Sequence, residues 1–183
     1  MLEHRSFYYL RHGQTEWNLS GRAQGQQDVE LNATGRAQAT SAIPKLLQTG
    51  ITAICVSPLK RALETASVIS AALQIPTLVI DDLKEACLGE CEGSRKGAWF
   101  EQWKAGVTPV GAEPFDDFIG RGLRGLNTAL GSGERVLIVA HGGTYWAVEG
   151  ATGVRLEEDV PNCTPIYHSA PSPKGSPWTL KAL

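Results

Sequence analysis

Two short apolar runs in this chain each end in a histidine followed by glycine. The first, Phe7-Tyr8-Tyr9-Leu10, leads into Arg11-His12-Gly13, and the second, Val136-Leu137-Ile138-Val139-Ala140, leads into His141-Gly142-Gly143. Runs of this length and content predict buried β-strands. If the two strands are parallel in one sheet, both imidazoles lie at its carboxyl edge, where open α/β sheets bind ligands. The pattern therefore predicts an anion site, with a phosphate held between two histidines.

The remaining segments alternate between strand-like and helical patterns. Further strands are predicted at residues 53–56, 77–80, 164–168 and 178–183. Helices are predicted at residues 35–47, 59–73, 99–104, 115–130 and 142–152, and Pro44 is expected to kink or divide the first of them. Residues 82–97, which contain several glycines, are expected to form an exposed loop. This alternation predicts an α/β fold, a three-layer sandwich with a mostly parallel central sheet flanked by helices.

Composition bounds the class of protein. A length of 183 residues with 42% hydrophobic content predicts a single domain over residues 1–183. The formal net charge of -2 provides no global basic field, so we expect no nucleic-acid partner and no membrane surface. Without a signal-peptide pattern or a membrane-length apolar run, we expect a cytoplasmic protein. Oligomeric state is not indicated by the sequence.

The four cysteines, Cys55, Cys87, Cys91 and Cys163, contain no Cys-x-x-Cys pair. We expect reduced and mostly buried thiols, because their even number alone does not establish disulfides in a chain of this size. Cys87 and Cys91 lack the second pair that a metal site needs.

Residues beside the two histidines suit a phosphate ester. Planar guanidinium groups bind doubly negative oxygens in a bidentate way, and Arg11 and Arg61 both follow predicted strands, so we interpret them as phosphate clamps. A surface ion pair with Glu64 is the alternative for Arg61. Asn18 is expected to donate one more hydrogen bond. Gly142, with Gly13, is expected to let the backbone approach the anion, beside the amides that open the helix after the second histidine.

The two histidines are assigned different roles. A histidine attacks phosphorus through an unprotonated ring nitrogen, so a backbone carbonyl that accepts its other N–H would fix tautomer and direction. We assign this nucleophilic role to His12. His141, protonated or donating, would stabilise charge on the equatorial oxygens during transfer. The two rings are therefore expected to differ in protonation.

A third group must protonate the leaving alkoxide. A carboxyl beside a phosphate dianion tends to hold its proton, and Glu85 is the best candidate for this acid. Glu90 and Glu92 share its segment and stay open as alternatives. Residues Trp99, Phe100 and Trp103 have helical spacing and are expected to pack in the core, with a substrate mouth as the alternative.

Four blocks of sequence are similar, in order, to the motifs of the histidine phosphatase superfamily, in its phosphoglycerate mutase-like branch. The blocks are Arg11 to Asn18 with Gly21-Arg22 after it, Ser57 to Ala66, Leu83-Lys84-Glu85 with Gly89 and Glu92-Gly93, and His141-Gly142-Gly143. The resemblance implies that a phosphohistidine forms on His12 and that Glu85 transfers the proton, without a metal or another cofactor. It also implies phosphate contacts from Arg11, Asn18, Arg61 and His141. Two positions, Gln14 and Pro44, depart from the family pattern.

The sequence therefore predicts a metal-independent phosphomonoester hydrolase acting on a small phosphorylated metabolite. A phosphoglycerate mutase is one alternative, but mutases of this family carry an insertion with a tyrosine and an arginine pair after the acid, and Ala86-Cys87-Leu88-Gly89 contains no tyrosine. A non-catalytic module that binds phosphorylated ligands is the other, although binding alone needs neither a nucleophile nor an acid. Among substrates, α-ribazole phosphate, a sugar phosphate and a phosphorylated three-carbon acid stay open.

Overall fold

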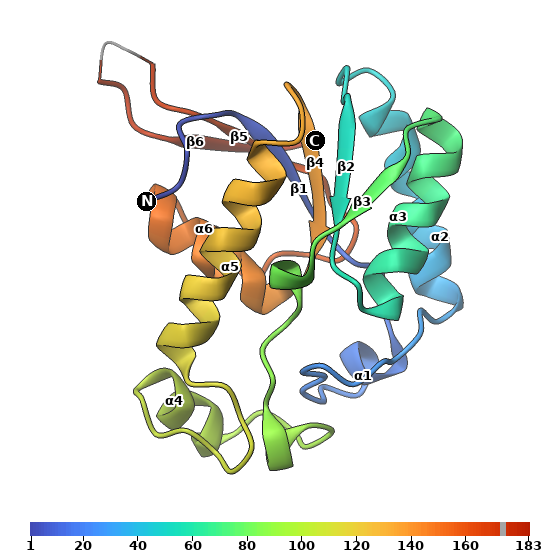
Figure 1. Cartoon of the computed structure of the whole chain (residues 1–183). Helices are drawn as coiled ribbons and strands as arrows, with labels where there is room; N and C mark the ends of the chain where they lie inside the picture. The colour runs from blue at the N-terminus through green and yellow to red at the C-terminus, as the bar shows by residue number, and fades with distance from the viewer. Residues whose placement is uncertain (173–174) are drawn as a thin grey trace.

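The computed structural model describes residues 1–172 and 175–183 and arranges them around one sheet (Figure 1). Its strands are β1 (Phe7–Arg11), β2 (Ala53–Val56), β3 (Thr77–Val79), β4 (Val136–Ala140), β5 (Ile166–Ser169) and β6 (Thr179–Ala182). The order across the sheet is β3-β2-β4-β1-β5-β6. The first four neighbours run parallel, and β5 pairs antiparallel with both β1 and β6. The predicted α/β class with a mostly parallel sheet is confirmed.

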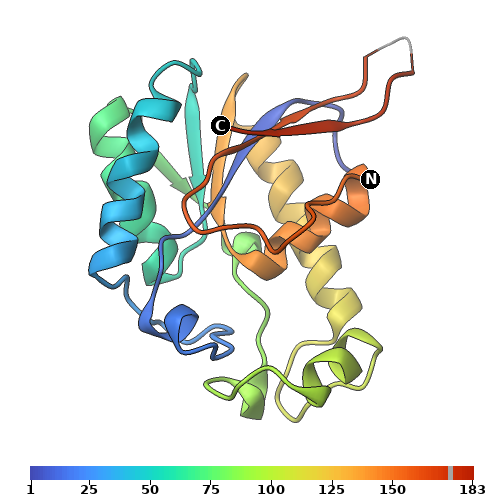
Figure 2. The ribbon, with the colours of Figure 1, turned by 180° about the vertical axis from the view of Figure 1, so that it is seen from behind.

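Helices form the two outer layers. They are α1 (Glu16–Leu19), α2 (Ala33–Leu46), α3 (Lys60–Leu73), α4 (Ala98–Lys104), α5 (Phe115–Leu130) and α6 (Gly142–Thr152). Figure 1 shows α2 and α3 on one face of the sheet and α5 and α6 on the other, and the view from behind in Figure 2 shows the same layers. The short helices α1 and α4 lie beyond the lower end of the sheet in Figure 1.

The central strand β4 supplies both cores. All five of its residues are buried, as expected for a parallel strand that is covered on both faces. Its alternate side chains point to opposite faces. Val136, Ile138 and Ala140 pack with residues of α5 and α6, whereas Leu137 and Val139 pack with residues of α2 and α3. A third apolar cluster surrounds α4 and includes Ala23, Ala86, Leu88, Phe100, Trp103 and Phe118.

The first long helix differs from its prediction at both ends. It begins at Ala33 because the Asn32 side chain accepts the backbone N–H of Gly35 at 2.8 Å and caps the helix. Pro44 lies inside α2 and does not divide it, since the helix continues to Leu46. Pro44 stands in the last turn, so only a short stretch of helix follows the lost hydrogen bond.

The segment at residues 82–97 was predicted to be an exposed loop, and this is wrong for its apolar residues. It includes the end of the 3₁₀ helix η1 (Asp81–Leu83) and all of η2 (Gly89–Cys91). Leu83, Ala86 and Leu88 are buried because they pack against α5 and the aromatic cluster around α4. The part of the segment up to Leu88 is therefore packed against the protein, whereas residues 94–97 are exposed as predicted.

The cysteines are free thiols, of which Cys55 and Cys163 are buried while Cys87 and Cys91 are only half-buried. Residues 173–174, between the strands predicted at residues 164–168 and 178–183, lie outside the described residues. Within residues 1–172 and 175–183, no helix combines the length and apolar character that crossing a bilayer requires.

Candidate active site

Strand register brings the two His-Gly sequences together. Arg11 at the end of β1 pairs with Ala140 at the end of β4, and the N–H of His12 donates to the Ala140 carbonyl at 3.0 Å. The next residue of each strand, His12 or His141, therefore leaves the sheet at the same level. Their ring centroids are 5.3 Å apart. The predicted meeting of the two imidazoles at one sheet edge is confirmed.

His12 has a defined tautomer. Its Nδ1 lies 2.7 Å from the Gly13 carbonyl, which accepts the Nδ1 proton and leaves Nε2 unprotonated. Asn162 donates its side-chain N–H to the His12 carbonyl at 2.6 Å and so holds the backbone as well. Burial, with the positive charges of Arg61 and Arg11, lowers the pKa of His12 well below its ordinary value, against the smaller effect of the Gly13 bond. The ring is neutral near pH 7.

His141 is held by Ser57, the residue that follows β2. Its Nε2 lies 2.7 Å from the Ser57 hydroxyl, and its Nδ1 is buried without a hydrogen-bond partner in the described part of the chain. Burial, followed by the charges of Arg61 and neighbouring groups, lowers the pKa of His141 well below its ordinary value. Both rings of the protein by itself are therefore neutral near pH 7. The two rings therefore do not differ in protonation as expected, because a third positive charge is unfavourable beside the two arginines. They differ in the nitrogen that has a hydrogen-bond partner, which is Nδ1 in His12 and Nε2 in His141.

The two arginines reach the same place from different elements. Arg11 donates from Nη1 to the Val160 carbonyl at 2.8 Å. Arg61, in the first turn of α3, is only 1% exposed and donates to the carbonyls of Gly25 and Gln27 at 2.7 and 2.8 Å. Burial lowers the pKa of Arg61 to about 10, so it keeps its charge at neutral pH. The Nε atoms of both arginines are buried without a partner among the described residues.

The alternative of a surface ion pair between Arg61 and Glu64 is wrong. Glu64 pairs with Arg36 of α2 at 3.2 Å, at the solvent-exposed side of the two helices. The sequence could not show that Arg61 is buried. Arg61 lies outside the apolar stripe of the helix predicted at residues 59–73, a position typical of a surface residue, but the chain around Gly25 covers it.

Glu85 is the carboxylate that faces this group. Its Oε2 accepts the Gly143 N–H and its Oε1 accepts the Ala86 N–H, each at 3.0 Å, so the side chain is fixed at the start of α6. Of the three carboxylates left open by the sequence, Glu85 alone borders the cavity described below. Glu92 instead accepts backbone N–H groups of Gln26 at 2.8 Å and Leu88 at 3.2 Å, which makes it a support of the neighbouring loops.

Asn18 and the glycines have separate local roles. The Asn18 Oδ1 accepts the N–H and the hydroxyl of Thr15, so its amide nitrogen is the end left for a ligand. Gly142 borders the cavity and lies against the Arg11 guanidinium. The expectation that Gly13 admits an anion needs correction: a Cβ at Gly13 would collide with the Gly35 carbonyl, so this glycine allows β1 and α2 to approach. The Gly143 amide is already occupied by Glu85.

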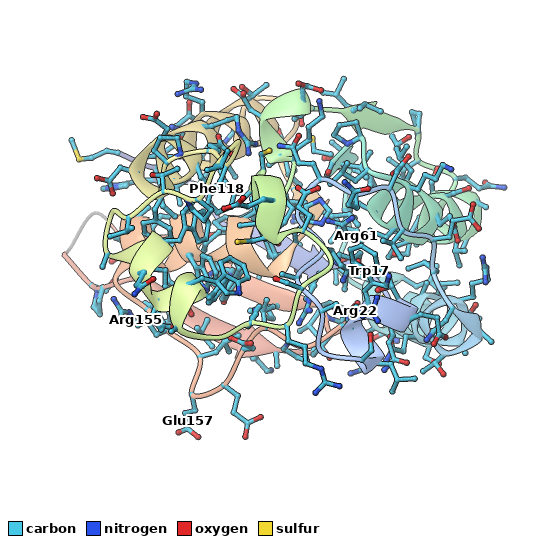
Figure 3. All side chains as sticks on the ribbon, turned by 90° about the horizontal axis from the view of Figure 1, so that it is seen from below. Trp17, Arg22, Arg61, Phe118, Arg155 and Glu157 are labelled. Carbon is cyan, nitrogen blue, oxygen red and sulfur yellow. The ribbon has the colours of Figure 1, made fainter. Side chains whose placement is uncertain are left out.

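A cavity of about 290 Å³ is bordered by Arg11, His12, Asn18, Arg61, Glu85, Gly142 and Gly143. Figure 3 views the molecule from below, with Arg61, Arg22 and Trp17 on one side of the site and Arg155 and Glu157 on the other. The cavity is also bordered by residues to which the sequence analysis assigned no site role: Arg22, Tyr145, Trp146, Glu149 and residues 155–160. Phe100 and Trp103 pack in the aromatic cluster and also border the cavity, so both alternatives hold for them.

The sequence did contain a signal for some of these additional lining residues. Tyr145, Trp146 and Glu149 lie four, five and eight residues after His141, and such spacings return to one side of a helix. Residues 155–160 offered no such signal, since their approach to the site depends on where the chain goes after α6.

Comparison with known proteins fits this geometry. Residues 7–161 match the family model of the histidine phosphatase superfamily, branch 1. The chain belongs to that branch. Relatives of this histidine phosphatase include an uncharacterized phosphatase, PhoE, of Bacillus subtilis (strain 168), 36% identical over 141 residues that cover 76% of this chain and 72% of the relative. A metal-independent phosphoserine phosphatase of Arabidopsis thaliana is 34% identical over 154 residues, which cover 76% of this chain and 65% of the relative.

A solved structure shows the same fold over nearly the whole chain. A mycobacterial glucosyl-3-phosphoglycerate phosphatase, in complex with VO3, matches with a TM-score of 0.81 and 27% identity over 97% of this chain and 98% of that chain. The resemblance inferred from the four motif blocks is confirmed. This histidine phosphatase is thus a phosphatase or mutase-like enzyme of a family that acts on small phosphorylated substrates.

Proposed function

We propose that this histidine phosphatase hydrolyses small phosphomonoesters through a phosphohistidine on His12, without a metal ion. The observation that carries the proposal is the convergence of unpartnered nitrogens at one cavity. Three of them belong to residues that border the cavity: Nε2 of His12 and the buried Nε atoms of Arg11 and Arg61. The fourth is the buried Nδ1 of His141, whose ring centroid lies 5.3 Å from that of His12. Buried polar atoms without partners are rare in proteins. The oxygens of a phosphoryl group would accept from the two arginine Nε atoms and from Nδ1 of His141, while the unprotonated Nε2 of His12 would face the phosphorus.

In the first half-reaction, Nε2 of His12 attacks phosphorus as the bond to the ester oxygen breaks. Glu85 gives its proton to the leaving oxygen, which departs as the alcohol. For His141 to donate from Nδ1, its Nε2 must accept the hydroxyl of Ser57, which lies 2.7 Å away. From Nδ1, with the two guanidinium groups, His141 stabilises charge on the non-bridging oxygens.

In the second half-reaction, water replaces the alcohol. Glu85, now a carboxylate, accepts a proton from the water as its oxygen attacks the phosphorus of the phosphohistidine. The P–N bond breaks, inorganic phosphate leaves, and His12 returns to the tautomer with Nδ1 bonded to Gly13. The Gly143 amide holds the Glu85 carboxyl in place in both halves.

The rest of the cavity lining supports water rather than a phosphoglycerate as the acceptor. A mutase must hold a carboxylate-bearing acceptor and outcompete bulk water at about 55 M, which requires dedicated cations. Besides Arg11 and Arg61, the cations that border the cavity are Arg22, Lys96 and Arg155. They stand among four acids, Glu149, Glu157, Glu158 and Asp159, and an apolar wall around Trp146. This mixture does not favour a small polyanion as acceptor.

The test is phosphate release from a panel of phosphomonoesters, with and without a chelator, beside an assay for interconversion of 3-phosphoglycerate and 2-phosphoglycerate with a bisphosphoglycerate primer. Phosphoserine and glucosyl-3-phosphoglycerate belong in the panel, because relatives are named for them. We expect chelator-insensitive release and little isomerisation. Brief mixing with labelled substrate should trap an acid-labile, base-stable phosphoryl group that His12→Ala abolishes. If isomerisation is faster than phosphate release, the protein is a mutase and the hydrolase proposal is wrong. If the His12→Ala protein is labelled as strongly as wild type, His12 is not the nucleophile.

A further inference from the structure

The backbone that carries Glu85 lies between two 3₁₀ helices, outside any strand or α-helix. A side-chain amide and a guanidinium group hold it. Gln26 donates from Nε2 to the carbonyl of Glu85 at 3.0 Å. Arg121 of α5 donates from Nη1 to the carbonyls of Asp82 and Lys84, both at 3.0 Å, and from Nη2 to the carbonyl of Glu85 at 3.2 Å. A single side chain thus contacts three of the four carbonyls from Asp82 to Glu85.

Arg121 is itself fixed by Glu113. Its Nε and Nη2 donate to the two carboxylate oxygens of Glu113, each at 2.8 Å, and the two side chains are 16% and 18% exposed. With these two bonds and the three to carbonyls, all five N–H groups of the guanidinium have an acceptor. A lysine ammonium has three donors and no planar fork, so it would not reproduce the set.

Glu113 and helix α5 also contact the segment of Glu85 directly. The Glu113 N–H donates to the Cys87 carbonyl at 2.9 Å, two residues beyond the acid. On α5, a Cβ at Gly125 would lie 2.8 Å from the Asp82 carbonyl carbon, so glycine is needed for the helix to approach η1 this closely. Neither Arg121 nor Glu113 borders the cavity, so they act through Glu85 rather than on the substrate.

We infer that Arg121, oriented by Glu113, is a positioning residue that sets where the Glu85 carboxyl meets the leaving oxygen. The inference rests on the proposed role of Glu85. Proton transfer needs the acid within hydrogen-bond reach of the leaving oxygen, and a misplacement of about 1 Å costs on the order of 10²-fold in rate. The hydrogen bonds of η1 end at the Lys84 N–H, so the backbone at Glu85 itself depends on contacts from other elements to keep that distance.

The test compares Arg121→Lys with Arg124→Lys. Arg124 stands one turn further along α5 and contacts the same segment, but through an exposed ion pair with the Asp82 side chain at 3.5 Å and with its own side chain 66% exposed. For each protein, kcat/KM is measured with p-nitrophenyl phosphate, a good leaving group, and with an alkyl phosphate, a poor one. The Kd of inorganic phosphate and the melting temperature are measured alongside.

For Arg121→Lys we expect a loss of about 10- to 100-fold with the alkyl phosphate and about threefold or less with p-nitrophenyl phosphate, at an unchanged Kd for phosphate. Arg124→Lys should stay within about twofold of wild type on both substrates. In the background of Glu85→Gln, Arg121→Lys should add no further leaving-group dependence. Equal losses on both substrates, while Glu85→Gln alone shows a selective loss, would overturn the inference and leave the proposed function standing.

Failure of the proposed function has a different signature: Glu85→Gln would then lose activity equally with both leaving groups, and the positioning role would fall with it. If Arg121→Lys does not fold, Glu113→Gln serves in its place, because it keeps one acceptor for Arg121 and removes the other. It should show the same selective loss, smaller in size, and Glu113→Gln with no selective loss would also overturn the inference.

Discussion

His168 of β5 offers a measurable link between burial and pH. Its ring is fully buried, is stacked on Phe7 with 4.8 Å between centroids, and lies with Nε2 3.2 Å from the Tyr145 hydroxyl. Its Nδ1 is buried without a partner in the described part of the chain. Burial lowers the pKa of His168 to about 4. In the unfolded chain the same ring titrates near 6.5.

The sign and size of the effect follow from these two values. Between pH 6.5 and pH 4 the unfolded chain binds a proton at His168 that the folded chain does not, so the free energy of unfolding falls as the pH falls. Above about pH 6.5 neither state binds the proton and the contribution is constant. From pH 7 to pH 5 the loss due to this one ring is about 2 kcal/mol.

Urea unfolding of wild type and His168→Gln at pH 7, 6 and 5 isolates that loss. Glutamine keeps an amide group near the Tyr145 hydroxyl but does not titrate. The other two buried histidines, His12 and His141, contribute equally to both proteins and cancel in the difference. We expect the stability difference to move by about 2 kcal/mol in favour of the variant between pH 7 and pH 5. Parallel pH profiles would refute the reasoning, since they would mean that folding leaves the pKa of His168 unchanged.

Three further predictions concern the site and its frame. Arg61→Ala should raise the Kd of inorganic phosphate by about 10- to 100-fold in calorimetry, whereas Glu85→Gln should lower turnover of an alkyl phosphate by about 10²–10⁴-fold with little change in that Kd; the reverse pattern would contradict both roles. Gly35→Ala places a methyl group against the Gln14 carbonyl oxygen and should lower the free energy of unfolding in urea by about 1–3 kcal/mol. The control Gly150→Ala, whose Cβ meets no atom within 4 Å, should not destabilise the protein. Equal stabilities of the two variants would argue against the close contact at Gly35. Ser57→Ala removes the hydrogen bond that orients the second histidine and should lower kcat/KM by about tenfold, with unchanged melting temperature; an unchanged kcat/KM would show that the ring is held by packing alone.

The sequence by itself determined the layered sheet and the chemistry at its edge. Continuous apolar runs and period-3.6 patterns are local, so β4 and the helices at residues 115–130 and 142–152 could be predicted at their observed bounds. The two His-Gly strand ends required only that β1 and β4 be parallel neighbours, which the register confirms. The thiols, the segment after η1 and the course of the chain at Pro44 were predicted less well, because burial depends on what packs on a segment.

The sequence favoured Glu85 as the acid but left Glu90 and Glu92 open, and tertiary structure decided between them. Glu85 meets the Gly143 amide 58 residues away, whereas Glu92 meets the loop at Gln26, 66 residues away. Arg121 lies 36 residues from the carbonyl of Glu85 that it holds, on a helix whose sequence shows only an amphipathic pattern. Contacts between such distant positions are set by how the layers stack, and no local periodicity encodes them.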